Sequence, residues 1–138
     1  MSDELLADLR RDEGWRPCAY PDHLGYLTIG YGFLIDPDRS GGIPRPVAEF
    51  WLRYAVNEKL GDLRKKWPAF DSQPAEVQRA LGNMAYQLGV GRLLQFQKML
   101  DALSVANRSL AAEEALDSTW AKQTPSRAQR VAALIKGA

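Results

Sequence analysis

A long helical run, residues 46 to 67, constrains the fold more than any other part of this sequence. Pro46 is favoured in a first helical turn, and Pro68 prevents the helix from continuing. At about 100° per residue, the apolar side chains form two stripes on opposite faces. The stripes consist of Val47, Phe50, Trp51, Tyr54 and Ala55, confined to the first half, and of Leu52, Val56, Leu60, Leu63 and Trp67, which continue to the end. A surface helix needs one stripe, so the pattern predicts either a strut between two packing partners or a central core helix.

The segments on the two sides of this helix differ in kind. Before it, Ser2 can cap a helix that Gly14 ends, and two strand-like runs surround the turn Pro21–Gly25. A charged, glycine-rich loop then covers residues 36–42. After it, core-type spacing predicts helices over residues 74–88, near 93–95, over 98–103 and 109–118, and from the pair Thr124-Pro125 onward. An α+β fold that is mostly α is therefore expected.

Two carboxylates flank the aromatic, glycine-rich stretch that contains the predicted strands. Glu13 falls on the apolar face of the first helix and at its negative end, so we expect a half-buried carboxyl whose neutral form is favoured, as a general acid requires. Asp22 lies in the turn, where it should stay ionised and can act as a base. Thr28 follows six residues later. A glutamate at a helix end and an aspartate in a turn are each common without any function, and spacing alone leaves both interpretations open.

Three separated blocks of sequence carry a resemblance to a known family. They are Glu-Gly-x-Arg from Glu13 with Thr-Ile-Gly-Tyr-Gly from Thr28, the run Ala80 to Gly89, and Trp-x-x-Gln-Thr-Pro-x-Arg-x-x-Arg from Trp120. Their content and order closely resemble the phage-type lysozymes, the T-even phage endolysin group of glycoside hydrolase family 24. The resemblance covers nearly the whole chain.

The resemblance implies one lysozyme-like domain in which a small β-hairpin lobe and a helical lobe are joined by the long helix, with the active-site cleft between them. The small lobe would take residues 14–45, the linking helix 46–67, and the helical lobe 1–13 together with 68–138. In such a fold the chain would hydrolyse the β-1,4 bond between N-acetylmuramic acid and N-acetylglucosamine in bacterial peptidoglycan.

The resemblance also assigns roles to residues. Glu13 would be the general acid, and Asp22 with Thr28 would activate a water, with inversion expected. Leu34 and Tyr86 match substrate-binding positions in the cleft. Supporting roles fall to Arg127, which is expected to approach Glu13, and to Gln87. The single Cys18 and single His23 argue against a metal site, and no cofactor is expected. A lytic transglycosylase, which needs only the acid, and a non-catalytic peptidoglycan-binding protein are the alternatives.

The sequence departs from the family pattern at two places. Phe33 occupies the position where the family usually has histidine, so we expect apolar packing there. The connection from Asp36 to Gly42 is short for the family, which predicts a trimmed small lobe with less surface to hold the glycan strand.

Composition sets few limits on partners. The formal net charge is +1, so no strong field directs the protein to nucleic acid or membrane, and Cys18 is the single cysteine. The N-terminal residues show no signal peptide or membrane anchor. We therefore expect a monomer that acts on the glycan strand, binds no nucleic acid and inserts into no membrane. It would be made in the cytoplasm of a phage-infected or prophage-bearing bacterium and reach the wall after release by another factor.

Overall fold

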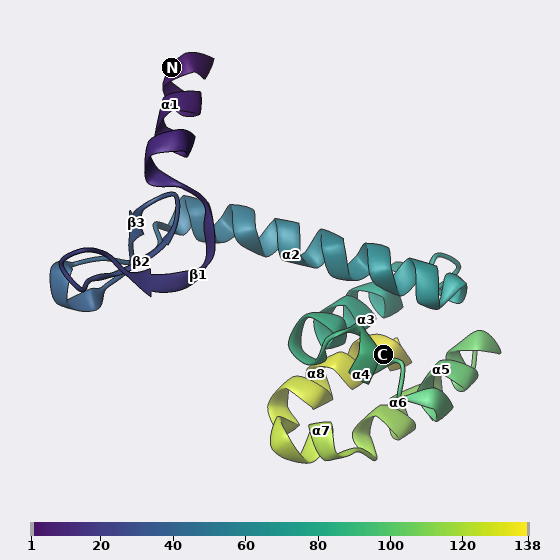
Figure 1. The fold of residues 1–138 in the computed structure, drawn as a ribbon. Helices are drawn as coiled ribbons and strands as arrows, with labels where there is room; N and C mark the ends of the chain where they lie inside the picture. Colours follow the sequence, from purple (N-terminus) through teal and green to yellow (C-terminus); the bar gives the residue numbers. More distant parts are fainter. Residues whose placement is uncertain (1, 138) are drawn as a thin grey trace. The chain divides into compact units, whose positions relative to one another are not determined.

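The computed structural model describes residues 2–137 and combines α-helices with one small antiparallel sheet (Figure 1). In chain order the elements are α1 (Asp3–Glu13), β1 (Arg16–Pro21), β2 (Leu27–Gly30), β3 (Phe33–Leu34), the 3-10 turn η1 (Pro37–Arg39), α2 (Arg45–Lys66), the 3-10 turn η2 (Pro68–Phe70), α3 (Ala75–Leu88), α4 (Val90–Leu93), α5 (Gln97–Ser104), α6 (Arg108–Leu116), α7 (Thr119–Gln123) and α8 (Pro125–Lys136). The predicted α+β class, mostly α, is confirmed.

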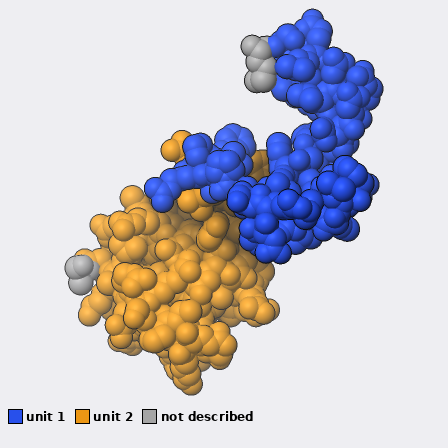
Figure 2. Space-filling view, turned by 90° about the vertical axis from the view of Figure 1, so that its left-hand side faces the viewer, with its two compact units in different colours: residues 1–50 blue, residues 51–138 orange. Residues whose placement is uncertain are grey.

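The chain divides into two compact units, residues 1–50 and 51–138 (Figure 2). Helix α2 begins in the first unit and continues into the second. The first unit contains α1 and the sheet, whose strand order is β1-β2-β3. Strand β2 lies in the centre, with Thr28 opposite Tyr20 of β1 and opposite Leu34 of β3. The central strand therefore carries a candidate catalytic residue.

Helix α1 begins and ends as the sequence predicts. The Ser2 hydroxyl oxygen accepts a hydrogen bond from the Leu5 N–H at 3.2 Å, and Gly14 adopts a positive φ of 70° at the C-terminal end. None of its residues is buried. The expected half-burial of Glu13 is therefore wrong: apolar residues do recur at helical spacing in α1, but none of them is buried and Glu13 is exposed.

The second unit holds a continuous apolar core. Helix α3 packs against α8, and α6 packs against both α5 and α8. Leu63 of α2 is fully buried in this core, and Leu60 approaches Gly82 of α3. The largest fully buried side chains are Phe70, Leu63, Leu81, Met84, Leu93, Met99, Leu100, Leu103, Ile135, Val77 and Val131.

Three details of the helical prediction needed correction. The short helix expected near residues 93–95 lies earlier, at Val90–Leu93, and residues 109–118 are followed by a separate short helix α7. Thr124 does not cap α8 with its side chain; its hydroxyl donates instead to the Trp120 carbonyl oxygen at 3.0 Å. Within residues 2–137, no helix is both long and apolar enough to cross a bilayer.

Candidate functional site

Thr28 is the only buried side chain among residues 2–50, with 5% of its surface exposed. Its hydroxyl donates a hydrogen bond to the Tyr26 carbonyl oxygen at 3.0 Å. A hydroxyl has one hydrogen and two lone pairs. Because the hydrogen is committed to Tyr26, the Thr28 oxygen can interact with a further group only as an acceptor.

Asp22 is held at the end of β1 by the turn that follows it. Its Oδ1 accepts hydrogen bonds from the N–H groups of Leu24 and Tyr26, both at 2.9 Å. Its own N–H donates to the Tyr26 carbonyl oxygen at 2.8 Å. The side chain is half-buried, and within residues 2–137 only Oδ1 of the two carboxylate oxygens takes hydrogen bonds. One oxygen is thus fixed by the backbone, and Oδ2 stays available.

Glu13 reaches the turn between β2 and β3. A Cβ atom placed on Gly32 would lie 3.0 Å from Glu13 Cδ and closer still to Oε2. Gly32 also has a φ of 73°, which favours glycine. The absence of a side chain at Gly32 therefore makes room for the Glu13 carboxyl group beside the sheet. Glu13, Asp22 and Thr28 all belong to the first unit.

Strand β3 places Leu34 and Phe33 beside the catalytic candidates. Leu34 pairs with Thr28, and Phe33 pairs with Ile29. The Phe33 ring lies across Gly30, where an added Cβ would stand 2.9 Å from Cδ2. The ring is nevertheless 60% exposed. The apolar packing expected at this position therefore leaves most of the ring in contact with solvent.

The remaining predicted residues lie in the second unit. Tyr86 of α3 is 45% exposed and lines a groove of about 510 Å³ together with Arg127 and Asn83. Arg127 Nε donates to Asn83 Oδ1 at 2.8 Å. Gln87 accepts a hydrogen bond from Trp120 Nε1 at 2.8 Å. Arg127 and Gln87 thus tie α3 to the C-terminal helices.

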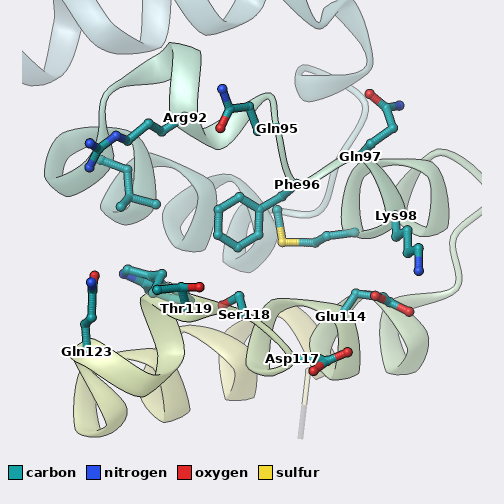
Figure 3. A pocket seen from close by; sticks show the side chains of 13 residues that line it. Arg92, Gln95, Phe96, Gln97, Lys98, Glu114, Asp117, Ser118, Thr119 and Gln123 are labelled. Atoms are coloured by element: carbon teal, nitrogen blue, oxygen red, sulfur yellow. The ribbon is translucent and has the colours of Figure 1, made fainter.

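A second hollow in the same unit, about 680 Å³, opens between α4–α5 and α6–α7 (Figure 3). Arg92 and Lys98 project from one wall, and Glu114 and Asp117 project from the other. The two carboxylates lie one helical turn apart on the same wall. They therefore do not flank a bond in the way that a pair of glycosidase carboxylates must. No predicted site residue lines this hollow.

Two residues of the site were missed by the sequence reasoning. Tyr26 joins Asp22 to Thr28 through its backbone, and Gly32 makes room for Glu13. Backbone hydrogen bonds leave no residue-type signal, so Tyr26 could not be found from the sequence. Gly32 did carry such a signal, because two glycines spaced two residues apart at the end of a strand allow another group to approach the backbone closely.

Comparison with known proteins identifies the family of this fold. The family model described as phage lysozyme matches residues 10–136, most of the chain. The match includes all three catalytic candidates and both units. The protein is therefore a lysozyme, a glycoside hydrolase whose class acts on peptidoglycan.

Three individual relatives match most of this chain. The pre-baseplate central spike protein Gp5 of Enterobacteria phage T4 is 33% identical over 92% of this chain, which spans 26% of that protein. Two proteins of Dictyostelium discoideum, probable T4-type lysozymes 1 and 2, are 28% and 27% identical over 93% and 99% of this chain and are covered over 91% and 95% of their own lengths. The chain belongs to the phage lysozyme family.

Proposed function

We propose that this lysozyme hydrolyses the β-1,4 bond between N-acetylmuramic acid and N-acetylglucosamine with inversion. Glu13 is the general acid, and Asp22 with Thr28 activates the attacking water. The observation that supports this assignment is the shared attachment of Asp22 and Thr28 to the backbone of Tyr26. This attachment fixes the position of the free carboxylate oxygen, Asp22 Oδ2, relative to the acceptor oxygen of the Thr28 hydroxyl.

The hydrogen-bond directions suit the orientation of one water molecule. The water donates one hydrogen to Asp22 Oδ2 and the other to Thr28 Oγ1, since the Thr28 hydrogen is already given to Tyr26. A lone pair of the water oxygen then points away from both groups, toward the anomeric carbon. A hydroxyl that could also donate would not fix this orientation.

The reaction is balanced by two proton transfers. The water oxygen forms a bond to the anomeric carbon while the glycosidic C–O bond breaks, and its electron pair goes to the leaving oxygen. Asp22 takes the proton of the water, and Glu13 protonates the leaving oxygen. Attack from the face opposite the leaving group inverts the anomeric centre.

Binding of the glycan strand is assigned to Leu34 and Tyr86, with Arg127 and Gln87 in support. Leu34 is partly exposed and pairs directly with Thr28, and Tyr86 presents an exposed aromatic surface. The grouping of residues 1–13 with 68–138 stays a prediction, as do the monomer and release to the wall by another factor.

Substitution of the two carboxylates tests the assignment. Glu13→Gln and Asp22→Asn keep side-chain shape but remove the acid and the base, so neither variant should clear a cell-wall suspension while both unfold cooperatively. Clearing by Asp22→Asn at the wild-type rate would contradict the assigned base. Mass spectrometry of the released fragments checks the reaction type, because an anhydro sugar end would show transglycosylation instead of hydrolysis.

A further inference from the structure

The backbone of Tyr26 connects the proposed base to the proposed hydroxyl. Its N–H donates to Asp22 Oδ1 at 2.9 Å. Its carbonyl oxygen accepts from the Asp22 N–H at 2.8 Å and from the Thr28 hydroxyl at 3.0 Å. Any displacement of Tyr26 therefore moves both groups that are assigned to the attacking water.

The Tyr26 side chain is held by Arg39, which ends the 3-10 turn η1. The Arg39 guanidinium lies over the Tyr26 ring, with Cζ 4.2 Å from the ring centroid, and Nη2 donates to the Tyr26 hydroxyl. A guanidinium over an aromatic face gains electrostatic attraction in addition to the hydrogen bond. Two different contacts thus fix one side chain.

Asp36 connects the turn η1 to Leu27, the residue that follows Tyr26. Its Oδ2 accepts the Leu27 N–H at 3.0 Å, and its Oδ1 accepts the Asp38 N–H at 3.0 Å. The Ile35 N–H donates to the Leu27 carbonyl oxygen at 3.0 Å. Gly41 closes the loop against the Asp36 backbone, where an added Cβ would lie 2.6 Å from the Asp36 nitrogen. The loop 36–42 is therefore fastened to β2.

Packing does not hold this part of the molecule. Among residues 2–50 no apolar side chain is buried, and Thr28 is the single buried residue. The position of Tyr26 thus depends on polar contacts more than it would in a unit with an apolar core. From outside the β1–β2 hairpin, the side chains of Arg39 and Asp36 reach Tyr26 and Leu27, in addition to the backbone hydrogen bond from Ile35 to Leu27.

We propose that Arg39 and Asp36 are positioning residues for hydrolysis, which hold Tyr26 and Leu27 and thereby set the relation of Asp22 to Thr28. This inference rests on the roles proposed for Asp22 and Thr28. Neither Arg39 nor Asp36 touches the substrate in this account. Loop 36–42, which follows β3, therefore helps to orient the attacking water.

The test measures kcat and KM of Arg39→Met, Tyr26→Phe and the double variant on soluble, uncross-linked glycan strands of peptidoglycan. Each single variant should lose about tenfold in kcat with KM changed by less than about twofold, because the attacking water is misplaced while binding surfaces remain. The double variant should lose no more than Arg39→Met alone, since Tyr26→Phe removes only the hydroxyl contact, which Arg39→Met already breaks together with the contact over the ring. Arg39→Lys, which keeps the cation, should recover part of kcat.

Arg16→Met is the matched control. Arg16 lies over the Tyr20 ring in the same sheet, with Cζ 4.3 Å from the centroid. Tyr20 pairs with Thr28 along the strand backbones, but within residues 2–137 no side-chain hydrogen bond connects Arg16 or Tyr20 to Asp22 or Thr28. Its kcat per folded molecule should stay near the wild-type value. Asp36→Asn replaces one carboxylate oxygen with an NH2 group, so the Leu27 N–H or the Asp38 N–H loses its acceptor. This variant should lower kcat in the same way as Arg39→Met.

Wild-type kcat in Arg39→Met, a loss no larger than that of Arg16→Met, or a change in KM alone would overturn the inference. Asp22→Asn and Thr28→Ala are measured in the same series. They separate the positioning role of Arg39 and Asp36 from the roles proposed for Asp22 and Thr28. If both are inactive while Arg39→Met is normal, only the positioning role fails. If Asp22→Asn or Thr28→Ala keeps full activity, the proposed function fails and this inference falls with it.

Discussion

Gly32→Ala perturbs the Glu13 carboxyl group without changing any charged residue. The new Cβ would lie 3.0 Å from Glu13 Cδ, where ordinary van der Waals contact begins at 3.4 Å, and closer still to Oε2. The carboxyl group must therefore move by about 1 Å, a displacement that can reduce a rate by about 10²-fold. The φ of 73° adds backbone strain of roughly 1–2 kcal/mol.

Gly89→Ala is the control that introduces backbone strain without displacing a carboxyl group. Gly89 has a φ of 83°, and nothing lies within 4 Å of an added Cβ. Both variants should therefore lose a similar roughly 1–2 kcal/mol of unfolding free energy, but only Gly32→Ala should lose activity. The assay is the initial rate of cell-wall clearing per folded molecule, with the folded fraction taken from circular dichroism. Equal rates in the two variants would refute the placement of Glu13 against Gly32.

Further predictions concern the stability of the second unit. Arg108→Met removes the donor to the carbonyl oxygens of Ile135 and Leu134 at the end of α8 and should cost about 2 kcal/mol in urea unfolding; a loss below about 0.5 kcal/mol would contradict that role. Leu81→Ala empties a fully buried position and should cost about 2–5 kcal/mol by the same measurement, whereas an unchanged midpoint would show that α3 is not part of the core. Trp120→Phe removes the hydrogen bond to Gln87 and should cost about 1 kcal/mol more in the wild-type background than in a Gln87→Ala background, where that bond is already absent.

Features that depend on neighbouring residues in the chain were predictable from the sequence. Ser2 and Gly14 mark the ends of α1 because capping needs particular side chains and a positive φ within one turn. The long helix ends within one residue of its predicted limits, since prolines act locally. The core position of Leu81 follows from helical spacing alone.

Features that depend on tertiary contact were not predictable in this way. Periodicity placed Glu13 on an apolar face but could not show whether anything covers that face, and the side chain is exposed. Strand β3 contains two residues, Phe33 and Leu34, too few for alternation to be detected. The hydroxyl of Thr124 could have capped α8, yet it found an acceptor in the preceding helix.

The candidate site also contains features that the sequence indicated and tertiary contacts that it did not. Asp22 and Thr28 were proposed as site residues because the motif that contains them resembles the phage-type lysozyme pattern, whereas spacing alone left their role open. Their attachment to Tyr26 was not, because it consists of backbone hydrogen bonds whose partners depend on the turn geometry. Arg39 and Asp36 lay in a segment predicted only to be a charged loop, and only the structure shows which groups they bind.

The stereochemistry of the first product tests the central claim most directly. Proton nuclear magnetic resonance can follow the anomeric signal of the new reducing end while wild-type protein cleaves soluble glycan strands, before mutarotation mixes the anomers. Attack by a water held between Asp22 and Thr28 predicts that the α-anomer appears first from the β-linked substrate. Initial appearance of the β-anomer would instead indicate a covalent intermediate and would contradict the assignment of Asp22 and Thr28.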